Sequence, residues 1–243
     1  MNMVQRVGEK VIQLRNAIYG VKHPKRILDF LIKERKLAKL LCCSVDEVKF
    51  YLKELDESGL IRMLESEVKK YNFPLGTMLT PLRAPILYTV VRALKPLVIV
   101  ETGVASGVST TLILNALSLN CRGRLFSIDM PDLDPGARLP YGKDVGWLVP
   151  SDLKERWYLI PGLSRDKLRP LLQELGSIDI FLHDSEHSYE NMMFEFKIAW
   201  FYLRKGGILL ADDITGNNAF RDFVRISKPT YWTTFGGLGA IRK

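Results

Sequence analysis

Side chains that can bind a metal ion or carry protons are concentrated in two short segments of the sequence. Asp184 and His187 follow one apolar run of strand length. Asp212 and Asp213 follow the next such run, and neither segment contains a lysine or arginine. Because parallel strands end at the same edge of a sheet, we expect these side chains to lie together there. Three carboxylates at one place repel each other unless a cation or hydrogen-bond donors compensate them, and a hard divalent ion with oxygen ligands is one solution. The sequence therefore predicts Asp184, Asp212 and Asp213 as metal ligands.

His187 is the candidate proton acceptor of this group. Its place three residues after Asp184, at the start of a helical pattern over residues 189–203, lets both side chains face one pocket. An imidazole with an ordinary pKa of about 6.5 suits proton removal at neutral pH. Asp184 and Glu186 favour the protonated ring, whereas a metal or the helix N-terminus opposes it, so the sequence leaves the pKa open. The alternative is a structural role, with His187 hydrogen-bonded to the rim.

A glycine-containing turn is the second candidate for chemistry. Glu101, Gly103 and Gly107 have the spacing Glu-x-Gly-x-x-x-Gly between the apolar run 97–100 and a helical pattern. A strand that enters a helix through glycines brings backbone N–H groups close to a ligand above the sheet edge. The spacing differs from the Gly-x-Gly-x-x-Gly of dinucleotide folds. An acid two residues before the first glycine suits a cationic or zwitterionic ligand better than a pyrophosphate.

Asp129 ends another short apolar run, over residues 125–128. An acid at the tip of the second strand can accept both ribose hydroxyls of an adenosine, as it does in nucleotide-binding folds. A lone acid at a strand end is more often a turn residue. The combination with the glycine turn favours the ligand role for Asp129.

The glycine turn resembles the first motif of the class I S-adenosylmethionine-dependent methyltransferases, which has the form Glu/Asp-x-Gly-x-x-x-Gly. The span 178–214 resembles a group of O-methyltransferases with an Asp-x-x-His-x-Tyr-Glu segment, a Gly-Gly pair and an Asp-Asp strand end. Here these residues are Asp184, His187, Tyr189, Glu190, Gly206, Gly207, Asp212 and Asp213. Further likeness at residues 146–150 and 162–164 extends the resemblance to about residues 80–243.

This resemblance implies S-adenosylmethionine as cofactor and methyl transfer to a hydroxyl of a small molecule, such as a sugar or a natural product. The cofactor-binding residues that it implies are Glu101, Gly103, Ser106, Gly107, Asp129, Gly162, Ser164 and Asp184. It implies Asp184 and His187 as catalytic residues. In related catechol-type enzymes Mg²⁺ sits on an Asp and an Asp-Asn pair, positions that match Asp184, Asp212 and Asp213. This sequence has Asp213 where those relatives have Asn, and His187 where their base is Lys.

Alternating strand and helix patterns must position these residues. Strands are predicted over residues 98–100, 125–128, 157–160, 178–182 and 208–211, and helices over 165–175 and 189–203. Two final strands, 231–235 and 238–242, flank Gly236-Gly237 and predict an antiparallel hairpin. This alternation predicts an α/β fold, a doubly wound, mostly parallel, Rossmann-like sheet of seven strands.

The first 70 residues are predicted to form a separate, helical domain, followed by the methyltransferase domain over residues 71–243, with a linker at 71–78 and a helix over 80–94. Ser44 and Glu47 form a capping box, and the helix that they start ends at Gly59. If residues 60–64 form a strand, the order resembles a winged helix. The would-be recognition helix is acidic, however, so nucleic acid is not the favoured partner. The alternatives are a cap over the active site or a homodimer surface.

The composition limits which kinds of protein this chain can be. The chain has 243 residues, a net charge of +8 and 47% hydrophobic residues, which is typical of a globular protein. Its three cysteines form neither a disulfide framework nor a zinc motif. The first ten residues lack the apolar core of a signal peptide, and no apolar run is long enough to span a bilayer, so a cytoplasmic protein without a membrane partner is expected. Two other functions stay open: a ligand-sensing DNA-binding regulator and a non-catalytic relative of the fold.

Overall fold

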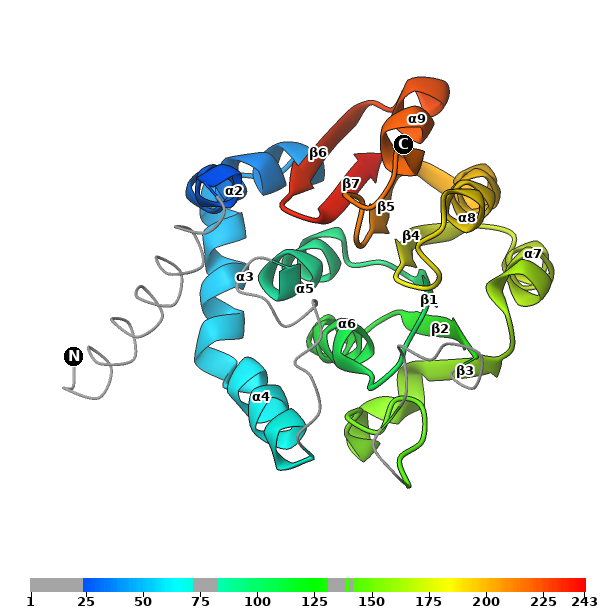
Figure 1. Cartoon of the computed structure of the whole chain (residues 1–243). Coiled ribbons are helices and arrows are strands. Elements are labelled where there is room, and N and C mark those ends of the chain that lie inside the picture. Colours follow the sequence, from blue (N-terminus) through cyan, green and yellow to red (C-terminus); the bar gives the residue numbers. More distant parts are fainter. Residues whose placement is uncertain (1–23, 72–82, 131–138, 140–141) are drawn as a thin grey trace.

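The computed structural model describes residues 24–71, 83–130, 139 and 142–243, and these residues form a seven-stranded sheet (Figure 1). The strands are β1 (Val98–Thr102), β2 (Arg124–Asp129), β3 (Trp157–Pro161), β4 (Ile178–His183), β5 (Leu203–Ala211), β6 (Tyr231–Phe235) and β7 (Leu238–Arg242). Their order is β3-β2-β1-β4-β5-β7-β6. The first five pair in parallel, and β7 runs antiparallel to both β5 and β6. The predicted fold class is confirmed, including the C-terminal hairpin.

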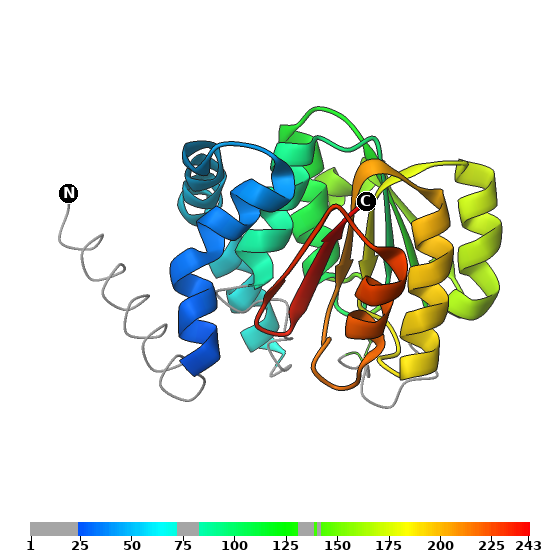
Figure 2. The same ribbon diagram turned by 90° about the horizontal axis from the view of Figure 1, so that it is seen from above.

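Helices cover both faces of this sheet (Figure 2). They are α2 (Pro24–Leu41), α3 (Val45–Ser58), α4 (Leu60–Lys70), α5 (Arg83–Leu94), α6 (Val108–Leu119), α7 (Ser164–Leu175), α8 (Tyr189–Tyr202) and α9 (Ala219–Ser227), with the 3-10 turn η4 (Ser151–Arg156) before β3. One hydrophobic cluster joins α2–α6 to the sheet, and a second joins α7–α9 to its other face. Residues of the central strand β4 alternate between the two clusters. Ile180 and Leu182 face the first cluster, and Phe181 faces the second. Apolar residues on both sides of a strand are typical of a covered parallel sheet.

The strand order reverses between β1 and β4. From β1 the chain passes through α6 to β2 and onward to β3, and then returns through α7 to β4 on the other side of β1. The two connections therefore leave the carboxyl ends of β1 and β4 open between them. In open α/β sheets, ligands bind outside the carboxyl ends of the strands at this switch point.

The N-terminal helices confirm part of the sequence prediction and correct another part. The Ser44 side chain accepts a hydrogen bond from the Glu47 amide at 3.1 Å, and Gly59 has a left-handed φ of 75° after α3. The strand expected over residues 60–64 is wrong, because these residues begin α4. Leu64 and Val68 are buried at a spacing of four residues, which is a helical period. The described residues therefore lack the strand that a winged helix needs at this place.

These helices pack against the rest of the fold. Glu54 of α3 accepts hydrogen bonds from Arg92 Nε at 2.6 Å and from the Tyr88 hydroxyl at 2.7 Å, both on α5. Lys36 of α2 donates to the carbonyl of Thr234 in β6 at 2.9 Å. The domain division expected at residue 70 stays a prediction. Helices on both sides of this residue share one hydrophobic cluster. The predicted linker and the expected helix start at residue 80 lie outside the described residues.

Candidate active site

The glycine turn lies directly against the end of β4. The Gly103 amide donates to the Ile128 carbonyl at 2.9 Å, and the Asp184 amide donates to the Thr102 carbonyl at 2.8 Å. Gly103 has a φ of +86°, and a Cβ there would lie 2.5 Å from the carbonyl carbon of Asp184 and closer still to its oxygen. Only glycine combines this backbone conformation with so close an approach. The turn therefore brings the predicted cofactor loop and the carboxylate rim together at the switch point.

Asp129 closes the glycine turn from the side of β2. Its Oδ2 accepts hydrogen bonds from the amides of Val104 at 2.7 Å and Ala105 at 2.6 Å. Both bonds use one carboxylate oxygen, so they leave Oδ1 for a ligand. The Gly162 amide donates to the Asp129 carbonyl at 3.0 Å, which places Gly162 beside this acid. The arrangement suits the predicted ribose contact and adds a second role, since Asp129 also shapes the loop.

Glu101 lies below the turn rather than at the ligand surface. Its side chain is fully buried and accepts hydrogen bonds from the hydroxyls of Ser109 and Thr110 in α6 and of Ser127 in β2. Burial raises the pKa of Glu101 to about 7, and the three hydroxyl donors oppose the rise. This position favours a role in fixing α6 to the sheet over the direct cofactor contact that the sequence predicts.

The buried carboxyl of Glu101 predicts a pH dependence of stability. Its folded-state pKa of about 7 exceeds the ordinary value of 4.5, so the folded protein binds this proton more tightly than the unfolded chain does. Its contribution to stability is therefore fully present below pH 4.5 and is lost as the pH rises to about 7. Relative to Glu101→Gln, the wild type should lose up to about 1.4 kcal/mol per pH unit across this window.

Urea unfolding at a series of pH values measures this difference. Glu155, an exposed residue of η4, supplies the control variant Glu155→Gln, which should track the wild type. A constant stability difference between wild type and Glu101→Gln from pH 4.5 to 7 would contradict a raised pKa at Glu101.

Residues 146–149 cover the start of α6. The Gly146 amide donates to the Ala105 carbonyl at 2.9 Å, and the Leu148 amide donates to the Ser106 carbonyl at 3.0 Å. Gly107 precedes α6 with a φ of +90°, and a Cβ there would lie 2.8 Å from Gly146 Cα. Ser106 is buried in this arrangement. The predicted cofactor loop is thus held on three sides, by Asp129, by the end of β4 and by residues 146–149.

Asp184 and His187 lie together at the rim, as the sequence predicts. His187 Nε2 is 3.7 Å from Asp184 Oδ1, and their side chains are 34% and 22% exposed. Burial raises the pKa of Asp184, with the contact to His187 opposing and the charge of Asp212 adding to the rise. Burial lowers the pKa of His187, but Asp184 and the neighbouring acids outweigh it, so this pKa lies above its ordinary value. The pair can hold and pass a proton.

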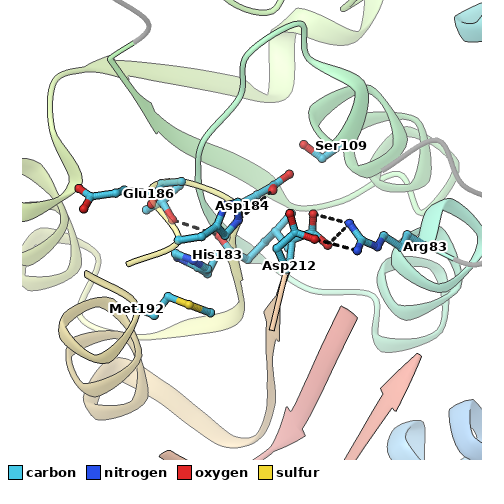
Figure 3. Close-up of polar contacts among 12 residues, drawn as sticks. Arg83, Ser109, His183, Asp184, Glu186, Met192 and Asp212 are labelled. Carbon is cyan, nitrogen blue, oxygen red and sulfur yellow. Dashed lines mark hydrogen bonds and ion pairs between the residues drawn. The ribbon is translucent and has the colours of Figure 1, made fainter. Parts of the chain in front are cut away.

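Arg83 of α5 changes the predicted metal site. Its Nη1 lies 2.6 Å from Oδ1 and 2.7 Å from Oδ2 of Asp212, and its Nη2 lies 2.9 Å from Asp213 Oδ1 (Figure 3). The carboxylate of Asp213 is therefore engaged by Arg83, and ligand atoms of Asp184, His187 and Asp212 converge instead, within 4.8 Å of one another. The cage of three carboxylates does not fit this arrangement, because a guanidinium already pairs with two of them.

A buried polar network below the rim joins β4 to α8. Glu195 is fully buried and accepts hydrogen bonds from the hydroxyls of Thr102 at 2.6 Å and Ser185 at 2.7 Å, and its Oε2 lies 2.7 Å from His183 Nδ1. Burial raises the pKa of Glu195, but His183 and the hydroxyl donors outweigh it, so the pKa lies below its ordinary value. The ring of His183 meets that of His187 edge-on, with centroids 5.3 Å apart. The network thus supports the imidazole of His187 from below.

Ser164 and two further residues complete the account. Ser164 begins α7, and its hydroxyl lies 3.4 Å from Asn191 Oδ1 in α8. Its predicted contact with the cofactor stays a prediction. Sequence reasoning missed Arg83 and Glu195. Both lie in helices, away from the strand ends that signal a site, and no spacing rule connects them to the rim. Arg83 is the first residue of α5, which also carries Arg92, and Glu195 shares α8 with other charged residues, so neither side chain stood out in the sequence.

Comparisons with known proteins agree with this geometry. A family model described as a methyltransferase domain matches residues 100–214, which hold both the glycine turn and the rim. An O-methyltransferase from Bacillus cereus in complex with SAH has a TM-score of 0.54 at 18% identity, over 76% of this chain and 91% of that one. TomG from Streptomyces achromogenes, an O-methyltransferase of tomaymycin synthesis in complex with SAM, scores 0.53 at 15% identity, over 76% and 89%.

A putative caffeoyl-CoA O-methyltransferase from Staphylococcus aureus also scores 0.53, at 14% identity, over 79% of this chain and 99% of that one. No curated protein matches the sequence significantly. Likeness at these identities shows a shared fold, and the family match adds the domain's identity. Residues 100–214 match a methyltransferase domain, and the sheet around them has the fold of the O-methyltransferases named above.

Proposed function

We propose that this protein transfers a methyl group from S-adenosylmethionine to a hydroxyl of a small molecule. The observation that carries the proposal is the contact of Gly103 with the backbone of Asp184, which joins the glycine turn to the rim. A ligand on the turn therefore lies next to the partly exposed imidazole–carboxylate pair of His187 and Asp184. The structurally similar proteins from Bacillus cereus and Streptomyces achromogenes are O-methyltransferases, which supports the same chemistry.

The chain's own residues divide the work between binding and proton transfer. Oδ1 of Asp129 can accept the ribose hydroxyls while Oδ2 holds the turn. The cofactor supplies an already activated sulfonium methyl, so the protein has to align an acceptor oxygen and remove its proton. His187 takes that proton, and Asp184 orients the imidazole and stabilises its charged form. The acceptor oxygen gains the methyl group, and its proton moves to His187.

Cofactor binding tests this proposal by calorimetry with S-adenosylhomocysteine. The wild type should bind, and Asp129→Ala should lose the ribose contact and the shape of the turn. Asp129→Asn keeps an oxygen for the amides of Val104 and Ala105 but loses the charge. Because a hydrogen bond to a charged group contributes about 1.5–3 kcal/mol, it should bind about 10–100-fold more weakly.

Asp56 of α3, an exposed acid, gives the control variant Asp56→Ala, whose affinity should equal that of the wild type. Absence of S-adenosylhomocysteine binding by the wild type would end the methyltransferase proposal. Equal affinity of Asp129→Asn and wild type would remove the ribose role of Asp129 and leave the rest.

Three predictions from the sequence belong to this proposal. They are a small hydroxylated acceptor, a homodimer formed through the N-terminal helices, and a place in the cytoplasm. None of the described helices has the length and apolarity that crossing a bilayer requires. A regulator that binds DNA through a winged helix gains no support, since residues 60–64 are helical.

A further inference from the structure

Arg83 lies at the rim, and the reaction proposed above does not use it. Its side chain is 8% exposed, and its two terminal nitrogens contact Asp212 and Asp213 (Figure 3). The turn between β6 and β7 lies against it, and a Cβ on Gly237 would collide with Arg83 Nη2. The guanidinium is thus enclosed by α5, the end of β5 and the β6–β7 turn. Such a planar, permanently charged group held on two carboxylates is a built feature of the site.

The carboxylates at this rim need positive charge nearby. Asp184, Asp212 and Asp213 follow adjacent strands, and carboxylates this close repel each other unless they are compensated. The ligand atoms of Asp184, His187 and Asp212 lie within 4.8 Å of one another, so the rim does not lack donors for a cation. The rim differs from a metal site because the Arg83 guanidinium already supplies a positive charge there. Any ion bound by Asp212 would share that carboxylate with Arg83 and would be repelled by its charge.

We propose that Arg83 takes the place of a divalent cation at this rim. Its guanidinium compensates Asp212 and Asp213 and keeps Mg²⁺ and Mn²⁺ out, so the protein works without a divalent ion. Asp184 then remains the partner of His187. The statement about turnover rests on the proposed methyl transfer, whereas the exclusion of metal ions rests on the geometry alone.

Calorimetric titration of Mg²⁺ and Mn²⁺ into wild type, Arg83→Met and Arg83→Lys tests the exclusion. The wild type should bind neither ion with a Kd below about 1 mM, the weak end of protein calcium sites. Arg83→Met removes the charge and should gain affinity for Mn²⁺ by at least about tenfold. Arg83→Lys keeps a positive charge and should exclude the ion as the wild type does. A role that is only structural predicts no gain of metal binding in any variant.

Arg92 gives a matched control, because it is a second largely buried arginine on α5 and pairs with Glu54, away from the rim. Arg92→Met should gain no affinity for either ion. Tight binding of Mg²⁺ or Mn²⁺ by the wild type overturns the inference, and so does turnover that stops in excess chelator and returns with metal. These wild-type measurements decide the question even if Arg83→Met fails to fold. Failure of the wild type to bind S-adenosylhomocysteine would refute the proposed methyl transfer. The metal titrations would still test whether Arg83 excludes divalent ions.

Discussion

Replacing His187 with alanine is expected to lower kcat by about 10²–10⁴-fold, the usual loss when a general base is removed. The imidazole reaches the rim half-buried and lies 3.7 Å from Asp184, and the described rim offers no second imidazole that is open to a ligand, because His183 is fully buried. The affinity for S-adenosylhomocysteine should stay near that of the wild type, since the proposed cofactor contacts lie on the glycine turn and at Asp129. Steady-state kinetics and calorimetry measure the two quantities separately.

Two further variants sharpen this test. His187→Gln keeps a polar side chain next to Asp184 but cannot accept a proton at neutral pH, so its kcat should fall as far as that of His187→Ala. Glu186, the preceding residue, is largely exposed and lies 3.7 Å from Arg165, so Glu186→Ala should keep nearly all activity. Wild-type kcat in His187→Ala would show that water or another group removes the proton.

Replacing Gly103 with alanine is expected to damage both stability and cofactor binding. The φ of +86° is strained for a residue with a side chain, and the new Cβ would overlap the backbone of Asp184 and lie 2.9 Å from the amide nitrogen of Ser185. Neither backbone atom can rotate away, so the end of β1 or of β4 must move. Strain and overpacking together should destabilise the protein by about 3 kcal/mol or more. Chemical unfolding and calorimetry with S-adenosylhomocysteine measure the two effects.

Gly176→Ala separates strain from collision. Gly176 follows α7 with a φ of +70°, and a Cβ there would meet no atom within 4 Å. This variant should lose only the conformational part, about 1–2 kcal/mol, and should bind S-adenosylhomocysteine normally. If Gly103→Ala behaved like Gly176→Ala, the contact between the glycine turn and the end of β4 would not matter for binding.

The sequence by itself determined which segments form the sheet and at which edge of it their polar residues lie. The apolar runs of β1, β2, β4 and β5 are long enough to be recognised because strands buried on both faces need them. Polar residues directly after such runs, as at Asp129 and Asp184, must lie at the carboxyl edge whatever the side-chain packing is. The capping box at Ser44 was equally readable, since a helix cap is a local interaction.

The local sequence pattern was less informative where the same residue types suit two different structures. The segment 60–64 is apolar and short, which suits a strand as well as a helix, and the buried faces of Leu64 and Val68 against neighbouring helices decide for α4. The same limit holds for Glu101. Its spacing from Gly103 places it at the end of β1, but only the hydroxyls of α6 and β2 show that it points into the interior.

Only the tertiary structure decided how charge is balanced at the rim. The two segments that carry Asp184, Asp212 and Asp213 contain no cation, so the sequence predicted a metal ion to compensate them. The fold brings Arg83 to Asp212 from α5, 129 residues earlier in the chain. The direction of a side chain at a strand end depends on the partner that packs against it. The local sequence pattern does not reveal a partner that is so distant in the chain. For this reason the meeting of these carboxylates at one sheet edge was predictable from the sequence, and their pairing with Arg83 was not.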